Sequence, residues 1–375
     1  MTDLAHDDGA RTALFHVALP SHSKLNWLLL AVPAAVLANQ QHAQAAAFAL
    51  SMLAIMPLAH MMGKATEEIA LRTSESLGGL INATFGNAVE MIIAVFALLA
   101  AASNPQVADT MVLVVQASLI GSILGNLLLV MGLSLLYGGL KHKEQTFSVT
   151  AASMNGSLLL LAVMALIVPA AIHTSGGGVG DVLVLSRATA IILLLLYGLA
   201  LLFQLGTHAE VFHTNTHSEH ESPTMSSKDA WLLLLVATAM VSWMAHLLVH
   251  NLESAVEAWH MPQLFIGVIL LPFFGNAAEH FAAVLMAGKN KMDLSIGIAI
   301  GSSVQIALLV APVMVLVGWM VGVDLGLEFG LLETAATFLS VLVANSLLSD
   351  GRTNWLEGAM LLGTYLILAV AFLVM

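Results

Sequence analysis

The sequence predicts an all-α polytopic membrane protein with 11 transmembrane helices: an N-terminal extra helix plus two inverted five-helix repeats. Three observations predict this class: an apolar composition, a series of long apolar segments and an internal repeat. Hydrophobic residues make up 59% of the 375 positions and charged residues only 9%, with a mean hydropathy of +0.93. Soluble domains carry about 25% charged residues, so a soluble protein with a large apolar core fits poorly.

The composition also restricts the partners. The chain has no cysteine, which excludes disulfides and thiolate metal sites. Acidic residues outnumber basic ones by 23 to 11, so no nucleic acid is expected to bind. The N-terminus is polar and acidic and lacks the basic and then apolar pattern of a signal peptide. We expect an integral membrane protein, and the short tails favour a bacterial inner membrane.

Each predicted span is an apolar segment of the length that a bilayer requires, about 20 residues, except for a shorter first one. In chain order the segments cover residues 26–40, 45–64, 78–101, 109–138, 147–171, 183–206, 229–249, 263–287, 294–320, 327–348 and 356–374.

The positions of the basic residues predict the orientation. With this span order, ten of the 11 Lys and Arg residues fall in the N-terminal tail or in loops on one side, and only Arg187 lies near the other side. An excess of Lys and Arg marks the cytoplasmic side. We therefore expect a cytoplasmic N-terminus and a C-terminus outside.

An internal repeat appears when the sequence is shifted by 189 residues. The polar identities are Asn87 with Asn276, Glu90 with Glu279, and Gln116 with Gln305. The two copies start five spans apart, an odd number, so they enter the membrane from opposite sides. Inverted repeats are typical of secondary transporters, with the site near the midplane. The predicted organisation is an N-terminal tail and extra helix (1–44), a first repeat (45–206), a cytoplasmic loop (207–228) and a second repeat (229–375).

The repeated motif reads FGNAVE at 85–90 and FGNAAE at 274–279, inside two apolar spans. An acidic side chain at the bilayer centre costs roughly 2.5–3.5 kcal/mol on insertion scales, so it suggests function. Gly86 and Gly275 permit a bend, which is tolerated at this depth only beside a cavity or protein. A protonated Glu bonded between helices is the alternative, and it explains a repeated pair less well.

The motif regions contain oxygen ligands that suit a hard cation such as Ca²⁺. The candidate ligands are Glu90, Glu279, Asn87, Asn276, Gln116, Gln305 and Ser302, with Ser303 beside the last. Helix–helix hydrogen bonding is the alternative for the uncharged ones. Two facing carboxylates at low dielectric need neutralisation, by protons or by a divalent cation. Because the same oxygens hold either, exchange of cation for protons follows.

At these residues the chain resembles the Ca²⁺/cation antiporter superfamily, specifically its Ca²⁺/H⁺ exchanger (CAX) family. The resemblance rests on GGLINATFGNAVEMI (78–92), FGNAAEH (274–280), TEE (66–68), IGSILGNLLLVMG (120–132), IGSSVQIALLVAP (300–312) and DGRTNWLEGAMLL (350–362). It implies that Glu90 and Glu279 bind Ca²⁺ and exchange protons. It also implies that His280 favours H⁺ over Na⁺ as counter-ion, a role in proton coupling for which a buried core histidine is the alternative. It suggests an ion-access role for Glu67 and Glu68, for which surface acids at the end of the span are the alternative.

The resemblance further implies an acidic regulatory segment in the loop 207–228. Its acids are Glu210, Glu219 and Glu221, but it also contains His208, His213, His217 and His220. Sensing of Ca²⁺, sensing of pH, loose binding of a transition metal and a merely solvated loop all remain open for this segment.

The expected function is therefore secondary active transport, exchanging cytoplasmic Ca²⁺ for external H⁺ by alternating access. The alternative is a Na⁺-coupled or other divalent-cation exchanger on the same scaffold; a cation channel fits the paired repeats less well. No nucleophile–base pair or nucleotide motif is found, so neither an enzyme nor a cofactor is expected, Ca²⁺ being the transported substrate. The expected partners are Ca²⁺, H⁺ and the lipid bilayer, and a homo-oligomer is left open.

Overall fold

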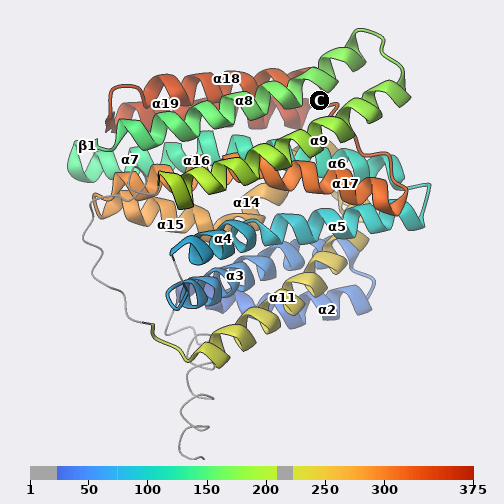
Figure 1. Ribbon diagram of the computed structural model, residues 1–375. Coiled ribbons are helices and arrows are strands. Elements are labelled where there is room, and N and C mark those ends of the chain that lie inside the picture. Colours follow the sequence, from blue (N-terminus) through green and yellow to red (C-terminus); the bar gives the residue numbers. More distant parts are fainter. Residues whose placement is uncertain (1–22, 74, 209–222) are drawn as a thin grey trace, which may run out of the picture. The chain divides into compact units, whose positions relative to one another are not determined.

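The structure, a computed structural model, describes residues 23–73, 75–208 and 223–375, and nearly all of these are helical (Figure 1). Seven helices among the described residues are long and apolar enough to cross a membrane, or up to nine if two bent pairs each form one span. The prediction of an all-α polytopic membrane protein is confirmed. The predicted count of 11 spans is not.

Two of the predicted spans are short for local reasons. The first begins as a 3₁₀ helix, η1 (Lys24–Leu30), and continues as α2 (Ala31–Gln40), which has only ten residues. The tenth loses its first turn because the chain is extended before α18 (Leu331–Leu347), which has 17 residues. Both are shorter than the roughly 20 residues that a straight span needs.

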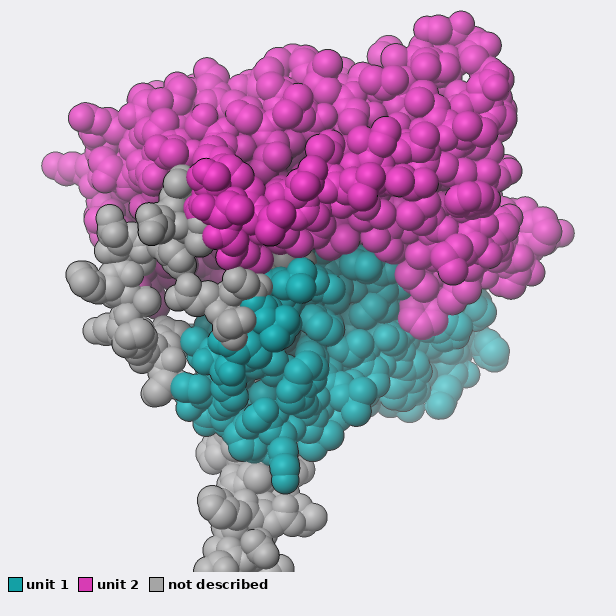
Figure 2. Space-filling model, viewed as in Figure 1, with its two compact units in different colours: residues 1–93, 215–260, 274–278 teal, residues 94–214, 261–273, 279–375 magenta. Residues whose placement is uncertain are grey.

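The chain forms two compact units, and each takes segments from both halves of the sequence (Figure 2). Unit 1 comprises residues 1–93, 215–260 and 274–278; unit 2 comprises residues 94–214, 261–273 and 279–375.

Besides η1 and α2, unit 1 contains α3 (Gln44–Ala70), α4 (Glu75–Gly86), the start of α5 (Ala88–Ser103), α11 (Ser227–His250) and α12 (Leu252–Trp259). The unit is built around α3. Figure 1 shows α11 beside it, and α2 and α12 also pack on it. Alanines 47, 54 and 65 of α3 are fully buried, and small residues of this kind let membrane helices approach closely. Between the ends of α2 and α11, Asn251 Nδ2 donates to Asn39 Oδ1 at 2.9 Å.

Unit 2 contains the remaining helices and two short strands. They are α6 (Ala108–Leu124), η2 (Gly125–Val130), α7 (Met131–His142), β1 (Glu144–Thr146), α8 (Val149–Thr174), α9 (Val179–Leu202), η3 (Phe203–Thr207), α13 (Gln263–Phe265), η4 (Ile266–Leu270), α14 (Leu271–Gly275), α15 (Ala277–Gly288), α16 (Met292–Gln305), η5 (Ile306–Val310), α17 (Ala311–Val321), α18, β2 (Arg352–Asn354) and α19 (Trp355–Val374). Helices α5, α14 and α15 each have residues in both units.

The core of unit 2 lies where α6 crosses η4. A Cβ atom at Gly121 would come within 2.1 Å of the Val268 carbonyl oxygen, and one at Gly267 within 2.5 Å of Ala117 Cβ. Only glycine fits at such a backbone contact. The segments η2, η4 and η5 are π-helical turns inside longer helices, and such turns often occur at functional sites.

Three loops of unit 2 meet at one end. Strands β1 and β2 pair antiparallel, with Glu144 opposite Asn354. Between them and α15, Gln145 Nε2 donates to the Ala287 carbonyl at 2.9 Å and to Asn290 Oδ1 at 2.8 Å. These are three loops that the charge pattern predicts on the cytoplasmic side, and here they share one end of the unit.

The outward surfaces of several helices are apolar, as a lipid environment requires. In the long helix formed by α9 and η3, only 17% of the most apolar stretch of residues is buried inside the protein. Leu195 and Leu199 of this helix are each more than 60% exposed. Water would disfavour such a surface, whereas hydrocarbon accommodates it.

Candidate cation-binding site

Both copies of the repeated motif interrupt a helix at the same position. The first ends α4 at Gly86 and starts α5 at Ala88, with a bend of 47°. The second ends α14 at Gly275 and starts α15 at Ala277. The intervening residues are both asparagines, Asn87 and Asn276, with 0% and 2% exposure. The expected interruption is thus present in each motif. In the second motif it divides the predicted span 263–287 between α14 and α15.

Each motif glutamate lies in the first turn of the helix that follows the break. Glu90 is the third residue of α5 and Glu279 the third of α15. Both side chains are partly buried. A helix N-terminus carries a partial positive charge, which stabilises a carboxylate or another anion in the first turn. The break therefore gives each intramembrane carboxylate a favourable position that an uninterrupted helix would not.

Helix α16 brings a hydroxyl to the second glutamate. The Ser302 hydroxyl donates a hydrogen bond to the Glu279 carboxylate, and Ser302 is 5% exposed. The other carboxylate oxygen, Glu279 Oε2, has no hydrogen-bond partner among the described residues. The hydroxyl of Ser303, the residue after Ser302, instead donates to the Ala299 carbonyl of its own helix. Of the two serines, Ser302 has the position that a ligand needs.

The two predicted glutamines lie on α6 and at the end of α16, and both are partly buried. Gln116 Nε2 donates to the Gly326 carbonyl at 3.0 Å. This bond orients the amide, because the nitrogen is engaged and the oxygen remains available as an acceptor. Gly326 was not expected from the sequence, since the contact joins residues 210 positions apart.

His280 follows Glu279 on α15 and is 8% exposed. Its ring contacts Phe273 edge-on, with the centroids 6.3 Å apart. Its Nε2 atom has no hydrogen-bond partner within the part of the chain that the structure describes. The predicted position beside the carboxylate, in an apolar setting, is therefore present, while its role in proton coupling stays a prediction.

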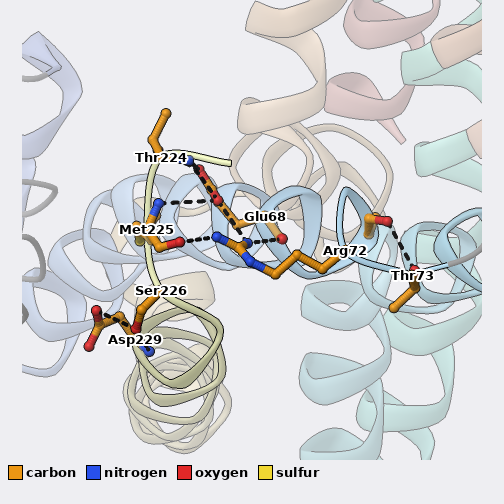
Figure 3. Close-up of polar contacts among 8 residues, drawn as sticks. Glu68, Arg72, Thr73, Thr224, Met225, Ser226 and Asp229 are labelled. Atoms are coloured by element: carbon orange, nitrogen blue, oxygen red, sulfur yellow. Dashed lines mark hydrogen bonds and ion pairs between the residues drawn. The ribbon is translucent and has the colours of Figure 1, made fainter. Parts of the chain in front are cut away.

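Of the acids in the TEE sequence, Glu67 is exposed and Glu68 is buried. Figure 3 shows the polar contacts of Glu68. The Glu68 carboxylate accepts hydrogen bonds from the backbone N–H groups of Thr224, at 2.9 Å, and Met225, at 3.3 Å. Arg72 contacts the same carboxylate at 3.0 Å and also donates to the Met225 carbonyl. This role was not predicted, although a Glu followed four residues later by an Arg is a recognisable helix pair in the sequence. The predicted regulatory residues Glu210, Glu219 and Glu221 lie outside the described residues.

The described residues contain no group of three or more His, Asp or Glu side chains that could hold a metal ion. The predicted set has two glutamates and otherwise neutral amide and hydroxyl oxygens. A cation there would depend on those neutral oxygens and on backbone carbonyls beside the helix breaks, as Ca²⁺ sites commonly do.

Fold and motifs together define an integral membrane protein with two acidic helix breaks 189 residues apart. Residues 43–206 and 229–374 match the family described as sodium/calcium exchanger protein. The chain belongs to this family.

Similar proteins cover nearly the whole chain. A protein of Aphanothece halophytica named Ca²⁺/H⁺ antiporter is 46% identical, over 92% of this chain and 95% of its own. The Ca²⁺/H⁺ antiporter ChaA of Bacillus subtilis (strain 168) is 42% identical, over 91% and 96%. The solved structure of native YfkE has a TM-score of 0.79 and 39% identity, over 93% and 98%. The resemblance to Ca²⁺/H⁺ exchangers is thereby confirmed.

Proposed function

We propose that this protein is a secondary active transporter that exchanges cytoplasmic Ca²⁺ for external H⁺ by alternating access. The observation that carries the proposal is the pair of helix breaks, each followed by a carboxylate in the first turn of the next helix. Carboxylates of this kind in low dielectric must be neutralised by protons or by a divalent cation. Because the two occupancies use the same oxygens, release of one accompanies binding of the other.

The relatives support the choice of ions. The proteins from Aphanothece halophytica and Bacillus subtilis are both named Ca²⁺/H⁺ antiporters, and the match covers more than nine-tenths of this chain. The chemistry of the candidate ligands agrees, because carboxylate, amide and hydroxyl oxygens suit Ca²⁺.

The choice of H⁺ over Na⁺ rests on His280. A buried imidazole one residue from the carboxylate is a titratable group, and a histidinium there would repel a divalent cation. We assign it to proton coupling and not to Ca²⁺ ligation, because adjacent residues on a helix point about 100° apart.

The orientation and assembly belong to the same proposal. The distribution of Lys and Arg supports a cytoplasmic N-terminus and an external C-terminus. The bacterial relatives support a bacterial inner membrane as the location. The ion gradients drive the exchange, so the proposal includes no cofactor and no enzymatic step. A homo-oligomer in the lipid bilayer is compatible with it.

Regulation by the loop 207–228 is also proposed. The contact of Glu68 with Thr224 and Met225 gives it a physical route, since it joins the end of that loop to α3 in unit 1. Removal of residues 212–222, which spares Thr224 and Met225, is expected to leave transport measurable and to alter its dependence on Ca²⁺ or pH. An unchanged activation profile would favour a loop without a regulatory role.

Ion flux into inverted vesicles tests the proposed exchange. We expect an outwardly directed proton gradient, with the lumen acidic, to drive ⁴⁵Ca²⁺ uptake, and an equal Na⁺ gradient to drive little. Uptake driven by Na⁺ alone would replace this proposal with the Na⁺-coupled alternative. Uptake that continues after both gradients are dissipated, down the Ca²⁺ gradient only, would indicate a channel.

A further inference from the structure

The segment 322–330, between α17 and α18, is an extended strap over one end of unit 2 (Figure 1). The span order predicts that this end faces outward. Leu325 and Leu327 of the strap are at most 2% exposed, so it is packed into the unit and not a free loop. Burial of extended backbone requires partners for its polar groups.

Three contacts hold the strap. The Gly326 carbonyl accepts from Gln116 Nε2 at 3.0 Å, and the Leu327 N–H donates to Ser186 Oγ at 3.0 Å. Asp324 pairs with Arg187 of α9 at 3.3 Å. The first contact matters most for transport, because Gln116 is a candidate cation ligand.

Glu328 is the strap's unexplained residue. Its carboxylate packs directly against the backbone of Gly326, and we call this position its seat. A Cβ atom added to Gly326 would lie 1.7 Å from Glu328 Oε2. Oε2 is buried and has no hydrogen-bond partner among the described residues. A charged oxygen in such a seat costs far more free energy than a protonated carboxyl group, because burial penalises a charge more than a neutral polar group.

The charged groups around Glu328 act on its pKa in opposite directions, and the nearby Arg187 is paired with another acid. Arg187 is engaged by Asp324 and lies over the Trp319 ring, 4.9 Å from its centroid. Burial raises the pKa of Glu328; its own backbone N–H and His173 of α8 lower that pKa, and Asp324 raises it. The carboxylate of Glu333, on α18, is seated on Gly330 and supplies no positive charge.

We propose that Glu328 binds a proton on the outer side and, through its seat on Gly326, acts as a positioning residue for Gln116. The neutral form keeps the strap packed with Gly326 bonded to Gln116. The ionised form leaves its seat for water, which frees the Gln116 amide. External acidity thus favours the state in which Gln116 is oriented. This inference rests on the proposed exchange of cytoplasmic Ca²⁺ for external H⁺.

The test is ⁴⁵Ca²⁺ uptake by inverted vesicles, whose lumen corresponds to the outside. Luminal pH is varied while the bath pH and Ca²⁺ concentration are fixed. Glu328→Gln keeps the group neutral, so we expect wild-type rates at acidic luminal pH. At alkaline luminal pH the variant should exceed the wild type by up to about tenfold, since a carboxyl one pH unit above its pKa is only about one-tenth protonated.

Asp181→Asn is the control, because Asp181 is an exposed acid at the start of α9, on the same predicted side, and is not among the groups that shift the pKa of Glu328. Its rate relative to wild type should not vary with luminal pH. Gly326→Ala displaces the Glu328 carboxylate from its seat, so adding Glu328→Gln to it should cause no further change in the profile.

A Glu328→Gln profile parallel to that of wild type would overturn the inference, as would equal pH-dependent effects of Asp181→Asn. Both outcomes presuppose that the wild type exchanges Ca²⁺ for H⁺. If the wild type takes up no Ca²⁺ under a proton gradient, the proposed function itself has failed.

Discussion

Two adjacent serines on α16 have different partners, and this difference separates a binding role from a structural one. The Ser302 hydroxyl reaches the Glu279 carboxylate, whereas Ser303 bonds the Ala299 carbonyl at 2.9 Å. The ligand set thus depends on which face of one helix turn a hydroxyl occupies.

Ser302→Ala should weaken Ca²⁺ affinity by about 10- to 100-fold, because a hydrogen bond to a charged group contributes about 1.5–3 kcal/mol. Ser303→Ala, the matched control, should change the affinity less than about twofold. Isothermal titration of the purified protein with Ca²⁺ measures both. Equal losses in the two variants would show that Ser302 has no special relation to the bound ion.

The Glu68 carboxylate gives a second prediction at this scale, for stability. Glu68→Ala leaves the N–H groups of Thr224 and Met225 without their acceptor, at a cost of about 1–3 kcal/mol. We expect a lower midpoint of thermal unfolding in detergent. Glu67→Ala, on the exposed side of the same turn, serves as control. A midpoint that falls equally in both variants would contradict the assigned contact.

Among the elements, the crossing of α6 with η4 has the least tolerance for added volume. The Val268 carbonyl occupies the space where a Gly121 side chain would begin. Gly125, one turn further along, has nothing within 4 Å of such a position.

Gly121→Ala should therefore destabilise the protein by about 1–3 kcal/mol, the usual cost of overpacking. Gly125→Ala should be nearly neutral. Thermal unfolding followed by fluorescence in detergent compares the two. If both variants unfold at the wild-type midpoint, the close crossing is wrong.

Some of these elements could be predicted from the sequence, and others could not. The helix breaks were predictable, because glycine, asparagine and glutamate at one spacing appear twice in apolar surroundings. The strap 322–330 and the pairing of β1 with β2 were not. Their side chains are apolar or ordinary, and their structure depends on contacts more than 100 residues away, such as Gln116 with Gly326.

For the site, the sequence identified the residue types and missed the partners. The Ser302 contact with Glu279 agrees with a predicted ligand. Glu68 was considered together with Glu67 as part of one acidic pair, and only burial distinguishes them. Local pattern indicates which side chains are unusual, whereas tertiary packing decides which of them are engaged.

At the scale of the whole molecule, the loops fall into groups that agree with the predicted sides. His142 Nε2 contacts the Gly288 carbonyl at 3.0 Å, so the loops after α7 and α15 share one end of unit 2. In unit 1, Arg72 contacts Met225, which joins two further loops predicted to be cytoplasmic.

This grouping predicts the outcome of cysteine labelling on a chain that has no native cysteine. Cysteines at positions 142 and 290 should react with an impermeant reagent from the cytoplasmic side. Those at 177 and 323 should react from the opposite side. Labelling of 142 and 177 from one face would contradict the predicted orientation and span order.

In the proposed exchange, the two motif carboxylates hold Ca²⁺ and protons in turn. The most direct measurement is pH-gradient-driven ⁴⁵Ca²⁺ uptake into inverted vesicles by Glu90→Gln and Glu279→Gln. Asp181→Asn, an exposed acid away from the motifs, is the control, and each variant is quantified in the membrane. We expect each motif variant to lose exchange, by at least about 100-fold, while the control retains it, because a neutral amide can neither give up a proton nor balance the cation's charge. Near-normal uptake by either motif variant would contradict the account.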